Sequence, residues 1–467
     1  MRLITWLIPV LLLTTCSREP GFEETARHVI LISMDTARAD HFGFLGNQRA
    51  ATPRLDELAD ESIVFTDCMT VVPTTLPSHT SLFTGKHPHH HGVARNGFTV
   101  NQTNQMLPEL LKRAGFLSVG FAGSFALDGA FGFDQGFDHY DQDFDRLAAV
   151  NSWEQNERSA TAVTDAVLRY LDEAGVPDRL FLFVHYFDPH HPYAAPDSYE
   201  MAYDPLGDSG LPPVSALRGD STFSPREKVR YGTRHTRHYA AEISYMDDQL
   251  GRLLDELRRR EVLEDALLLV TSDHGETFWE HDEKFNHGHR VYQTTIHAVC
   301  MLRLPRAARG GSRVDGLTAN IDILPTLLAF LGIPIPSEVD GQAIDLRSGS
   351  GLDSERKQFG QASKPWEDIE TDARWANLSK SRFVRSGPYK FIQTPYRGSE
   401  ELYDLARDPW ERHNLLTEPS QEILDIANEL RKDLESWAAT ADPLPSQFDP
   451  SQTQETMDRL RALGYFE

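Results

Sequence analysis

Three continuous apolar runs, each leading to an aspartate, constrain the fold of this chain more than any other feature. Residues 28–33 lead to Asp35, residues 180–187 to Asp188 and residues 266–271 to Asp273. Such runs are typical of strands buried on both faces of a parallel sheet. Ligands of these sheets bind beyond the carboxyl ends of the strands. We therefore expect the three aspartates to converge on one functional site.

Helical patterns separate the apolar runs. Thr52-Pro53 suits the start of a helix, and further helices are expected over residues 107–114, 158–174 and 239–259, with one more strand over 117–122. Strands that alternate with helices predict an α/β fold whose parallel sheet is covered on both faces. Residues 194–233 are rich in Pro, Gly, Ser and Asp, which predicts a long surface loop, a candidate lid.

The pattern changes after about residue 345. Residues 383–392 suit a hairpin that turns at Ser386-Gly387-Pro388, and Leu402-Tyr403-Asp404 suits a third strand. We predict a signal segment over 1–16, a linker over 17–27, a catalytic domain over 28–345 and a smaller C-terminal α+β subdomain over 346–467. A chain of 467 residues is long enough for this division.

Charge excludes some partners. The formal net charge is −24, so the surface repels nucleic acid and anionic membranes. An anionic substrate then needs a strongly positive local site. A bound metal ion is the simplest source of that charge.

The first sixteen residues predict export. Arg2 precedes an apolar run that ends at Cys16, too short to span a bilayer, and this arrangement resembles a bacterial lipobox. We expect a chain exported to the periplasm or cell envelope and lipid-anchored through Cys16. Simple secretion and an uncleaved anchor are the alternatives. Cys68 and Cys300 then remain, so no disulfide framework is expected.

The segment from Thr75 to Gly85, TLPSHTSLFTG, carries the most specific signal. It resembles the nucleophile segment of sulfatases and of the wider alkaline-phosphatase superfamily, which opens a helix. Further resemblances follow in the family's order over about residues 28–415. They are His91-Gly92-Val93, Asp188-Pro189-His190-His191-Pro192-Tyr193, Thr271-Ser272-Asp273-His274-Gly275-Glu276, Asp322-Ile323-Leu324-Pro325-Thr326-Leu327 and Leu402-Tyr403-Asp404-Leu405. The resemblance implies a parallel-sheet sandwich and a metal-dependent ester hydrolase.

The resemblance also implies a metal site. Asp35, Asp273 and His274 fall where the family's metal ligands lie, with the Thr75 oxygen as a fourth. One or two divalent ions are expected. Oxygen ligands suit Ca²⁺, whereas an imidazole shifts the preference toward Zn²⁺ or Mn²⁺. Typical sulfatases convert Cys or Ser at the nucleophile position to formylglycine. Thr75 cannot form that aldehyde, so we expect no formylglycine and a plain hydroxyl nucleophile.

Three departures from the family pattern bear on the substrate. Thr36 replaces a second Asp, His79 replaces an Arg, and residues 122–128 lack the Lys and His that contact sulfate in sulfatases. With Thr75 as nucleophile, these departures favour hydrolysis or transfer of phosphate mono- or diesters, as in phosphodiesterases of the superfamily. One alternative is a sulfatase that dispenses with formylglycine, and the other is a non-catalytic binding protein.

The remaining histidines complete the expected site. His79 is expected to stabilise charge on the transferred group, and His190 and His287 to bind the substrate and protonate the leaving oxygen. Glu276 is expected to orient His274. His87, His89 and His90 are interpreted as a polar loop, with His91 packed structurally.

Overall fold

An eight-stranded mixed sheet forms the centre of the molecule, in the order β10-β2-β9-β7-β1-β6-β4-β5. The computed structural model describes residues 26–144, 157–204, 224–282, 287–346, 355–362 and 381–440, with residues 456, 458–460 and 463. The strands are β1 (His28–Met34), β2 (Ile63–Phe65), β4 (Leu117–Phe121), β5 (His139–Asp141), β6 (Leu180–Tyr186), β7 (Ala266–Ser272), β9 (Cys300–Arg303) and β10 (Ser312–Val314). Strand β9 runs antiparallel to both of its neighbours, and the other pairs are parallel.

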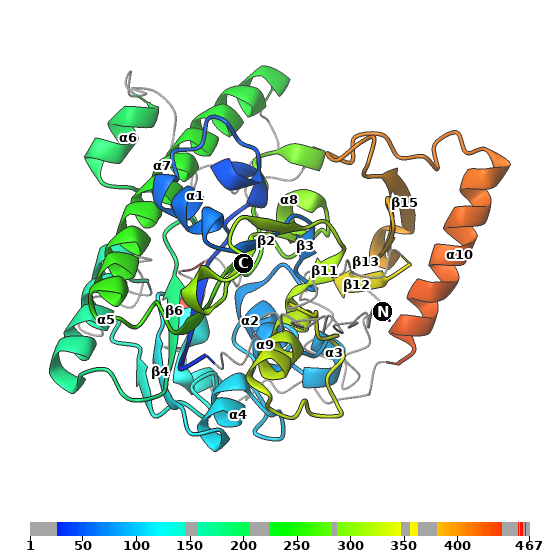
Figure 1. Cartoon of the computed structure of the whole chain (residues 1–467). Helices are drawn as coiled ribbons and strands as arrows, with labels where there is room; N and C mark the ends of the chain where they lie inside the picture. The colour runs from blue at the N-terminus through cyan, green and yellow to red at the C-terminus, as the bar shows by residue number, and fades with distance from the viewer. Residues whose placement is uncertain are drawn as a thin grey trace, which may run out of the picture.

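Helices cover both faces of this sheet, as the apolar runs predict (Figure 1). One layer holds α1 (Pro53–Asp60), α5 (Ala160–Ala174) and α7 (Pro225–Arg259); the other holds α2 (Thr75–Thr84), α4 (Leu107–Arg113) and α9 (Ile323–Leu331). Alternate residues of β1 face opposite layers, because Val29 and Leu31 join one core cluster and Ile30 and Ile32 the other. The fold is therefore an α/β sandwich.

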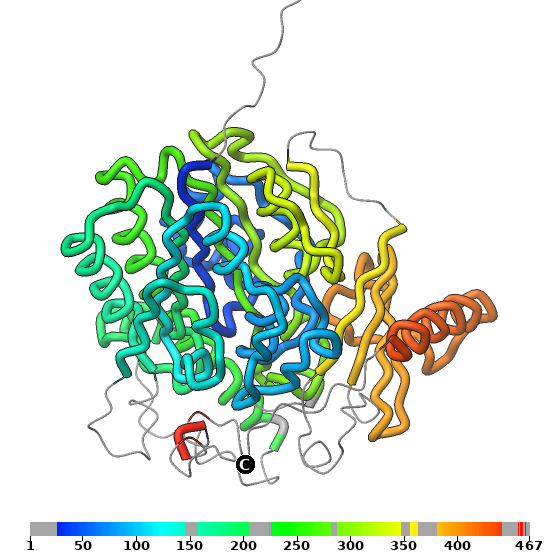
Figure 2. The backbone as a smooth tube through the Cα atoms, turned by 90° about the horizontal axis from the view of Figure 1, so that it is seen from below, coloured from blue at the N-terminus to red at the C-terminus, as the bar shows by residue number. Residues whose placement is uncertain are grey.

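A second sheet forms the C-terminal part. Its strands β12 (Lys357–Gln361), β13 (Arg382–Ser386), β14 (Tyr389–Thr394) and β15 (Ser399–Asp404) are antiparallel. This confirms the predicted hairpin and third strand. Helix α10 (Gln421–Ala438) packs Leu430 and Leu434 against this sheet and projects from the side of the main body (Figure 2). The predicted domain bounds stay a prediction.

Smaller elements connect these layers. Strands β3 (Cys68–Met69), β8 (His297–Ala298) and β11 (Thr318–Ala319) form a short sheet, and α3 (Pro88–His91), α6 (Asp197–Tyr203) and α8 (Gln293–Ile296) are short helices. Within the described ranges, no helix combines the length and the apolar character that crossing a membrane requires.

The expectation of one long loop over residues 194–233 is wrong where the structure describes it. Helix α6 lies inside that range, and α7 begins at Pro225 rather than near residue 239. The first turn of α7 is fixed by a capping box, in which Ser224 and Glu227 satisfy each other's backbone N–H groups. The basic residues that follow carry no apolar stripe, so the helical periodicity of apolar residues begins well after the first residue of α7. Residues 205–223 lie outside the described ranges.

Candidate active site

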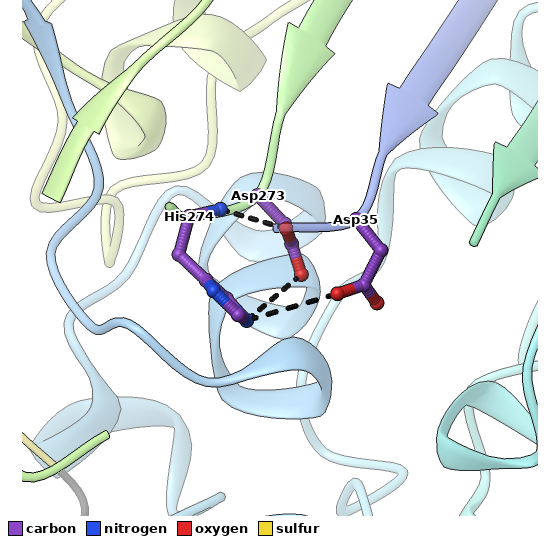
Figure 3. A group of neighbouring side chains, drawn as sticks. All are labelled: Asp35, Asp273 and His274. Atoms are coloured by element: carbon purple, nitrogen blue, oxygen red, sulfur yellow. Dashed lines mark hydrogen bonds and ion pairs between the residues drawn. The ribbon is translucent and has the colours of Figure 1, made fainter. Parts of the chain in front are cut away.

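The ends of strands β1 and β7 bring Asp35 and Asp273 together. Met34 pairs with Ser272 in the parallel ladder, so the next residue of each strand leaves the sheet beside the other. Nε2 of His274 lies 3.4 Å from Oδ2 of Asp273 and 4.0 Å from Oδ1 of Asp35. All three side chains are buried and point toward one another (Figure 3).

These three residues fit a divalent cation. One ligand atom from each lies within 4.8 Å of the others. Both oxygens of Asp35, Oδ2 of Asp273 and Nε2 of His274 are buried and make no hydrogen bond of normal geometry to any described residue. His274 donates Nδ1–H to the carbonyl of Gly275 over 3.0 Å, which leaves the Nε2 lone pair facing the carboxylates. Buried polar atoms of this kind are satisfied by a bound ion.

The electrostatics of the site point the same way. Burial raises the pKa of Asp35 to about 7 and the pKa of Asp273 well above its ordinary value, and Asp35 adds to the second effect. Burial lowers the pKa of His274 to about 3, so its imidazole is neutral. Two adjacent buried carboxylates cannot both ionise without a compensating positive charge. A cation would supply that charge.

Thr75 is the first residue of α2 and is fully buried. Its side chain lies beside the Asp35 carboxylate and favours the charged form of that group. Ser78 donates its hydroxyl to the carbonyl of Asp273 over 2.7 Å, which ties the first turn of α2 to the residue that follows β7. The positive end of the helix dipole therefore faces the place where an anionic group would meet Thr75.

His79 lies one turn along α2 and is fully buried. It donates Nδ1–H to the carbonyl of Thr75 over 2.8 Å and accepts a hydrogen bond at Nε2 from Ser33, also at 2.8 Å. Burial holds the pKa of His79 well below its usual range. Both ring nitrogens are engaged within the protein, and the carbonyl of Thr75 is one of the partners. The expected role of His79 in stabilising charge on the transferred group stays a prediction.

His190 and His287 lie together beside His274. The ring centroids of His190 and His287 are 5.3 Å apart, and those of His274 and His287 are 4.5 Å apart. His190 donates Nδ1–H to the carbonyl of His191 over 2.7 Å, and burial holds the pKa of His190 well below its usual range. His190 thus offers a lone pair at Nε2 rather than a proton. Glu276 faces His287 and not His274, which corrects the expected partner.

Comparisons with known proteins agree with this geometry. The family model described as Sulfatase matches residues 27–333, more than half of the chain. The chain belongs to the sulfatase family. A second model, described as the C-terminal part of N-sulphoglucosamine sulphohydrolase, matches residues 280–440. This sulfatase-family chain is an ester hydrolase of the alkaline-phosphatase-like superfamily, whose members depend on a metal, and Asp35, Asp273 and His274 are its candidate ligands.

Relatives of this sulfatase-family chain cover most of its length. An ulvan-active sulfatase of Formosa agariphila is 26% identical over 435 residues, covering 87% of this chain and 80% of that protein. An N-acetylglucosamine-6-O-sulfatase of Bacteroides thetaiotaomicron is 24% identical over 524 residues, covering 92% and 90%. The phosphonate monoester hydrolase of Silicibacter pomeroyi shares the fold with a TM-score of 0.70 at 19% identity, covering 89% of this chain and 96% of that one.

Two expectations for the sulfatase site do not hold. Asp188 does not join the other two aspartates: its Oδ1 accepts the backbone N–H of Ala160 at the start of α5 over 2.9 Å. His89 and His90 lie in helix α3 and His87 is its N-cap residue, so these three histidines do not form a polar loop. His87 and His89 are buried against Trp437 of α10, so this group lies at the contact with the C-terminal helix.

Sequence reasoning missed two residues of the sulfatase site. Asn96 is fully buried and accepts the backbone N–H of Leu76, the residue after Thr75, over 2.7 Å at its Oδ1. Its Nδ2 has no hydrogen-bond partner among the described residues. His185 lies on β6, with its Nε2 3.3 Å from Oδ2 of Asp35. A histidine inside a buried apolar run was the available signal for His185.

Proposed function

We propose that this sulfatase-family enzyme hydrolyses sulfate esters and uses the Thr75 hydroxyl in place of formylglycine. The observation that carries the proposal is the convergence of Asp35, Asp273 and His274 on the first turn of the helix that begins at Thr75. The substrate class is supported by the relatives that cover most of the chain, which are described as sulfatases. The sequence pattern favours phosphate esters, whereas the relatives favour the alternative, a sulfatase without formylglycine.

Asp35, Asp273, His274 and the Thr75 oxygen would hold the divalent cation. A bound cation of this kind lowers the pKa of an adjacent hydroxyl and neutralises charge on the transferred group. An imidazole beside two carboxylates suits Zn²⁺ or Mn²⁺ better than Ca²⁺. His287 and His190 are proposed to bind the substrate, and a second ion beside them stays part of the hypothesis.

Several side chains have separate roles in the proposed reaction. Thr75 Oγ1 passes its proton to the adjacent Asp35 carboxylate and attacks sulfur as the bond from sulfur to the leaving oxygen breaks. The leaving oxygen takes a proton from His287, which the Glu276 carboxylate can hold in its protonated form. Asn96 has a buried Nδ2 beside the first turn of α2, where a donor can bind an oxygen of the transferred group. Water then attacks sulfur and gives a proton back to His287, the bond from sulfur to Thr75 Oγ1 breaks, and that oxygen takes its proton back from Asp35.

Phosphate mono- and diesters form the second candidate class, and Thr75 is the observation that favours them. A formylglycine enzyme releases sulfate as its diol re-forms the aldehyde, and a threonine ester has no such exit. A threonine phosphate is opened by in-line attack of water on phosphorus.

Export and a lipid anchor at Cys16 stay proposals as well. Residues 1–25 lie outside the described ranges, so the structure does not test them.

Matched substrates test the choice. Purified, metal-loaded protein is assayed on aryl sulfate, aryl phosphate and aryl phosphate diester with the same leaving group. Faster turnover of the sulfate supports the proposal, and faster turnover of either phosphate ester overturns it in favour of the second class.

The nucleophile is tested with Thr75→Ala, Thr75→Ser and a control, Thr80→Ala, whose hydroxyl donates within α2 to the carbonyl of Leu76. We expect no turnover from Thr75→Ala, partial turnover from Thr75→Ser and full turnover from the control. Activity in Thr75→Ala removes Thr75 from the mechanism for both substrate classes.

A further inference from the structure

The two oxygens of the Asp35 carboxylate face different groups. Oδ1 faces the candidate metal ligands, with Nε2 of His274 at 4.0 Å. Oδ2 faces away from them, toward Nε2 of His185 at 3.3 Å. The orientation of Oδ1 toward a metal therefore depends on what holds Oδ2.

The neighbouring strand places His185 there. His185 is fully buried on β6, opposite Ser33 of β1 in the parallel ladder. Asp35 itself donates its backbone N–H to the carbonyl of Tyr186 over 2.9 Å, which fixes the end of β1 against β6. The side chains of His185 and Asp35 thus meet at a place that main-chain hydrogen bonds define.

The hydrogen bonds of His185 also fix its proton. The backbone N–H of Gly123 donates to Nδ1 of His185 over 3.3 Å, so the ring carries its hydrogen on Nε2. Nε2–H is then the donor that faces Oδ2 of Asp35. Gly123 suits this contact, because a Cβ at that position would lie 2.5 Å from the carbonyl oxygen of His185.

We propose that His185 is a positioning residue: its Nε2–H lies 3.3 Å from Oδ2 of Asp35, outside normal hydrogen-bond geometry, and attracts that oxygen, so that Oδ1 is aimed at the metal. The inference rests on the metal site of the proposed function. Partners that orient a metal ligand contribute about 10- to 100-fold to metal affinity. The competing role is simple packing, because the His185 ring also stacks on Phe183 with a centroid distance of 6.5 Å. Packing alone predicts a change in stability without a change in metal affinity.

Metal affinity separates the two roles. Metal-free protein is titrated with Zn²⁺ and with Mn²⁺ in competition with a chromogenic chelator, and the thermal unfolding of the metal-free form is recorded beside it. His185→Leu keeps an apolar side chain without the donor, and His185→Gln keeps an N–H donor. The matched control is His28→Leu, because His28 also accepts a backbone N–H at Nδ1, from Leu180 at 3.3 Å, at the opposite end of β1.

We expect about 10- to 100-fold weaker metal binding in His185→Leu, a smaller loss in His185→Gln and none in His28→Leu. Wild-type affinity in a folded His185→Leu overturns the proposal. If His185→Leu does not fold, His185→Gln decides between the two roles. Metal affinity of His185→Gln near that of the wild type supports a donor role, and metal affinity as weak as that of Asp35→Gln contradicts it. If the wild-type protein binds neither Zn²⁺ nor Mn²⁺, the metal site of the proposed function is refuted. That outcome differs from a failure of the His185 proposal, in which the wild type and His185→Leu bind metal equally well.

Discussion

Nδ1 of His287 lies 3.3 Å from Oε2 of Glu276, and both side chains are buried. A carboxylate at this distance favours the protonated imidazole and fixes its orientation. Both residues follow strand β7 in the chain, and the ring centroids of His287 and His274 are 4.5 Å apart. In the proposed mechanism this pair delivers the proton to the leaving oxygen.

Glu276→Gln should slow the release of poor leaving groups most. Without the carboxylate, His287 holds its proton less firmly, and general-acid help is worth about 10²- to 10⁴-fold for a basic leaving oxygen. We expect a large fall in kcat for alkyl esters and a small one for nitrophenyl esters, which need no acid. Equal losses for both substrates would contradict the assignment of the pair as the proton donor.

Asp273→Asn should remove metal and activity together, since the variant loses one of the two carboxylates that face the His274 ring. Metal content by elemental analysis and turnover are measured on the same preparation. The control is Asp322→Asn, because Asp322 pairs with Arg356 at 2.5 Å and accepts backbone N–H groups away from this site. Full metal content in Asp273→Asn would exclude Asp273 as a ligand.

Asp188→Asn should stabilise the protein at neutral pH and leave its stability unchanged at pH 4. Burial raises the pKa of Asp188 from 3.8 to about 7. The folded protein therefore keeps this proton to higher pH than the unfolded chain, and the free energy of unfolding falls as pH rises from about 4 to 7. The loss is up to about 1.4 kcal/mol per pH unit.

Urea unfolding of the metal-free protein at several pH values checks this prediction for Asp188. The difference between variant and wild type should grow from pH 4 to pH 7 and then level off. Asp178→Asn is the control, because the Asp178 side chain is 96% exposed. A difference that does not change with pH would exclude a buried charge at Asp188.

Asn96→Asp should weaken binding of the anionic substrate and, because the new carboxylate is fully buried, should lower the stability of the protein at neutral pH. The carboxylate keeps the acceptor for the backbone N–H of Leu76 but replaces the buried Nδ2 donor with negative charge. We expect KM to rise at least tenfold, measured at a temperature where thermal unfolding shows that the variant is folded. Asn96→Ala should instead lose about 1 kcal/mol, the typical value of one such hydrogen bond. An unchanged KM in Asn96→Asp would place Nδ2 outside the substrate site.

Cys16→Ser should release the protein from the membrane fraction. The wild type is expected to partition into detergent and to incorporate labelled fatty acid at Cys16, whereas the variant should do neither. Identical partitioning of the two proteins would argue against acylation and would leave export open.

The fold could be predicted from the sequence where burial repeats along the chain. Strands β1, β6 and β7 read as apolar runs, because both faces of each are covered. The start of α7 was missed, since its first turns are basic and solvent-facing. His185 and Asn96 were missed for another reason: each acts through a contact with a residue distant in the sequence, and no local pattern encodes such a contact.

The pairing of Met34 with Ser272 has one more consequence. Hydrogen bonds hold neighbouring strands about 4.8 Å apart, so the main chain fixes the distance between the backbones of Asp35 and Asp273. Loops can lengthen and helices can shift while that distance stays the same. Only the side chains can then change the distance between the two carboxylates, because exchanging Asp for Glu lengthens a side chain by one methylene group. A metal ion of different size would then be accommodated by the length of these two side chains, which changes by one methylene group at a time.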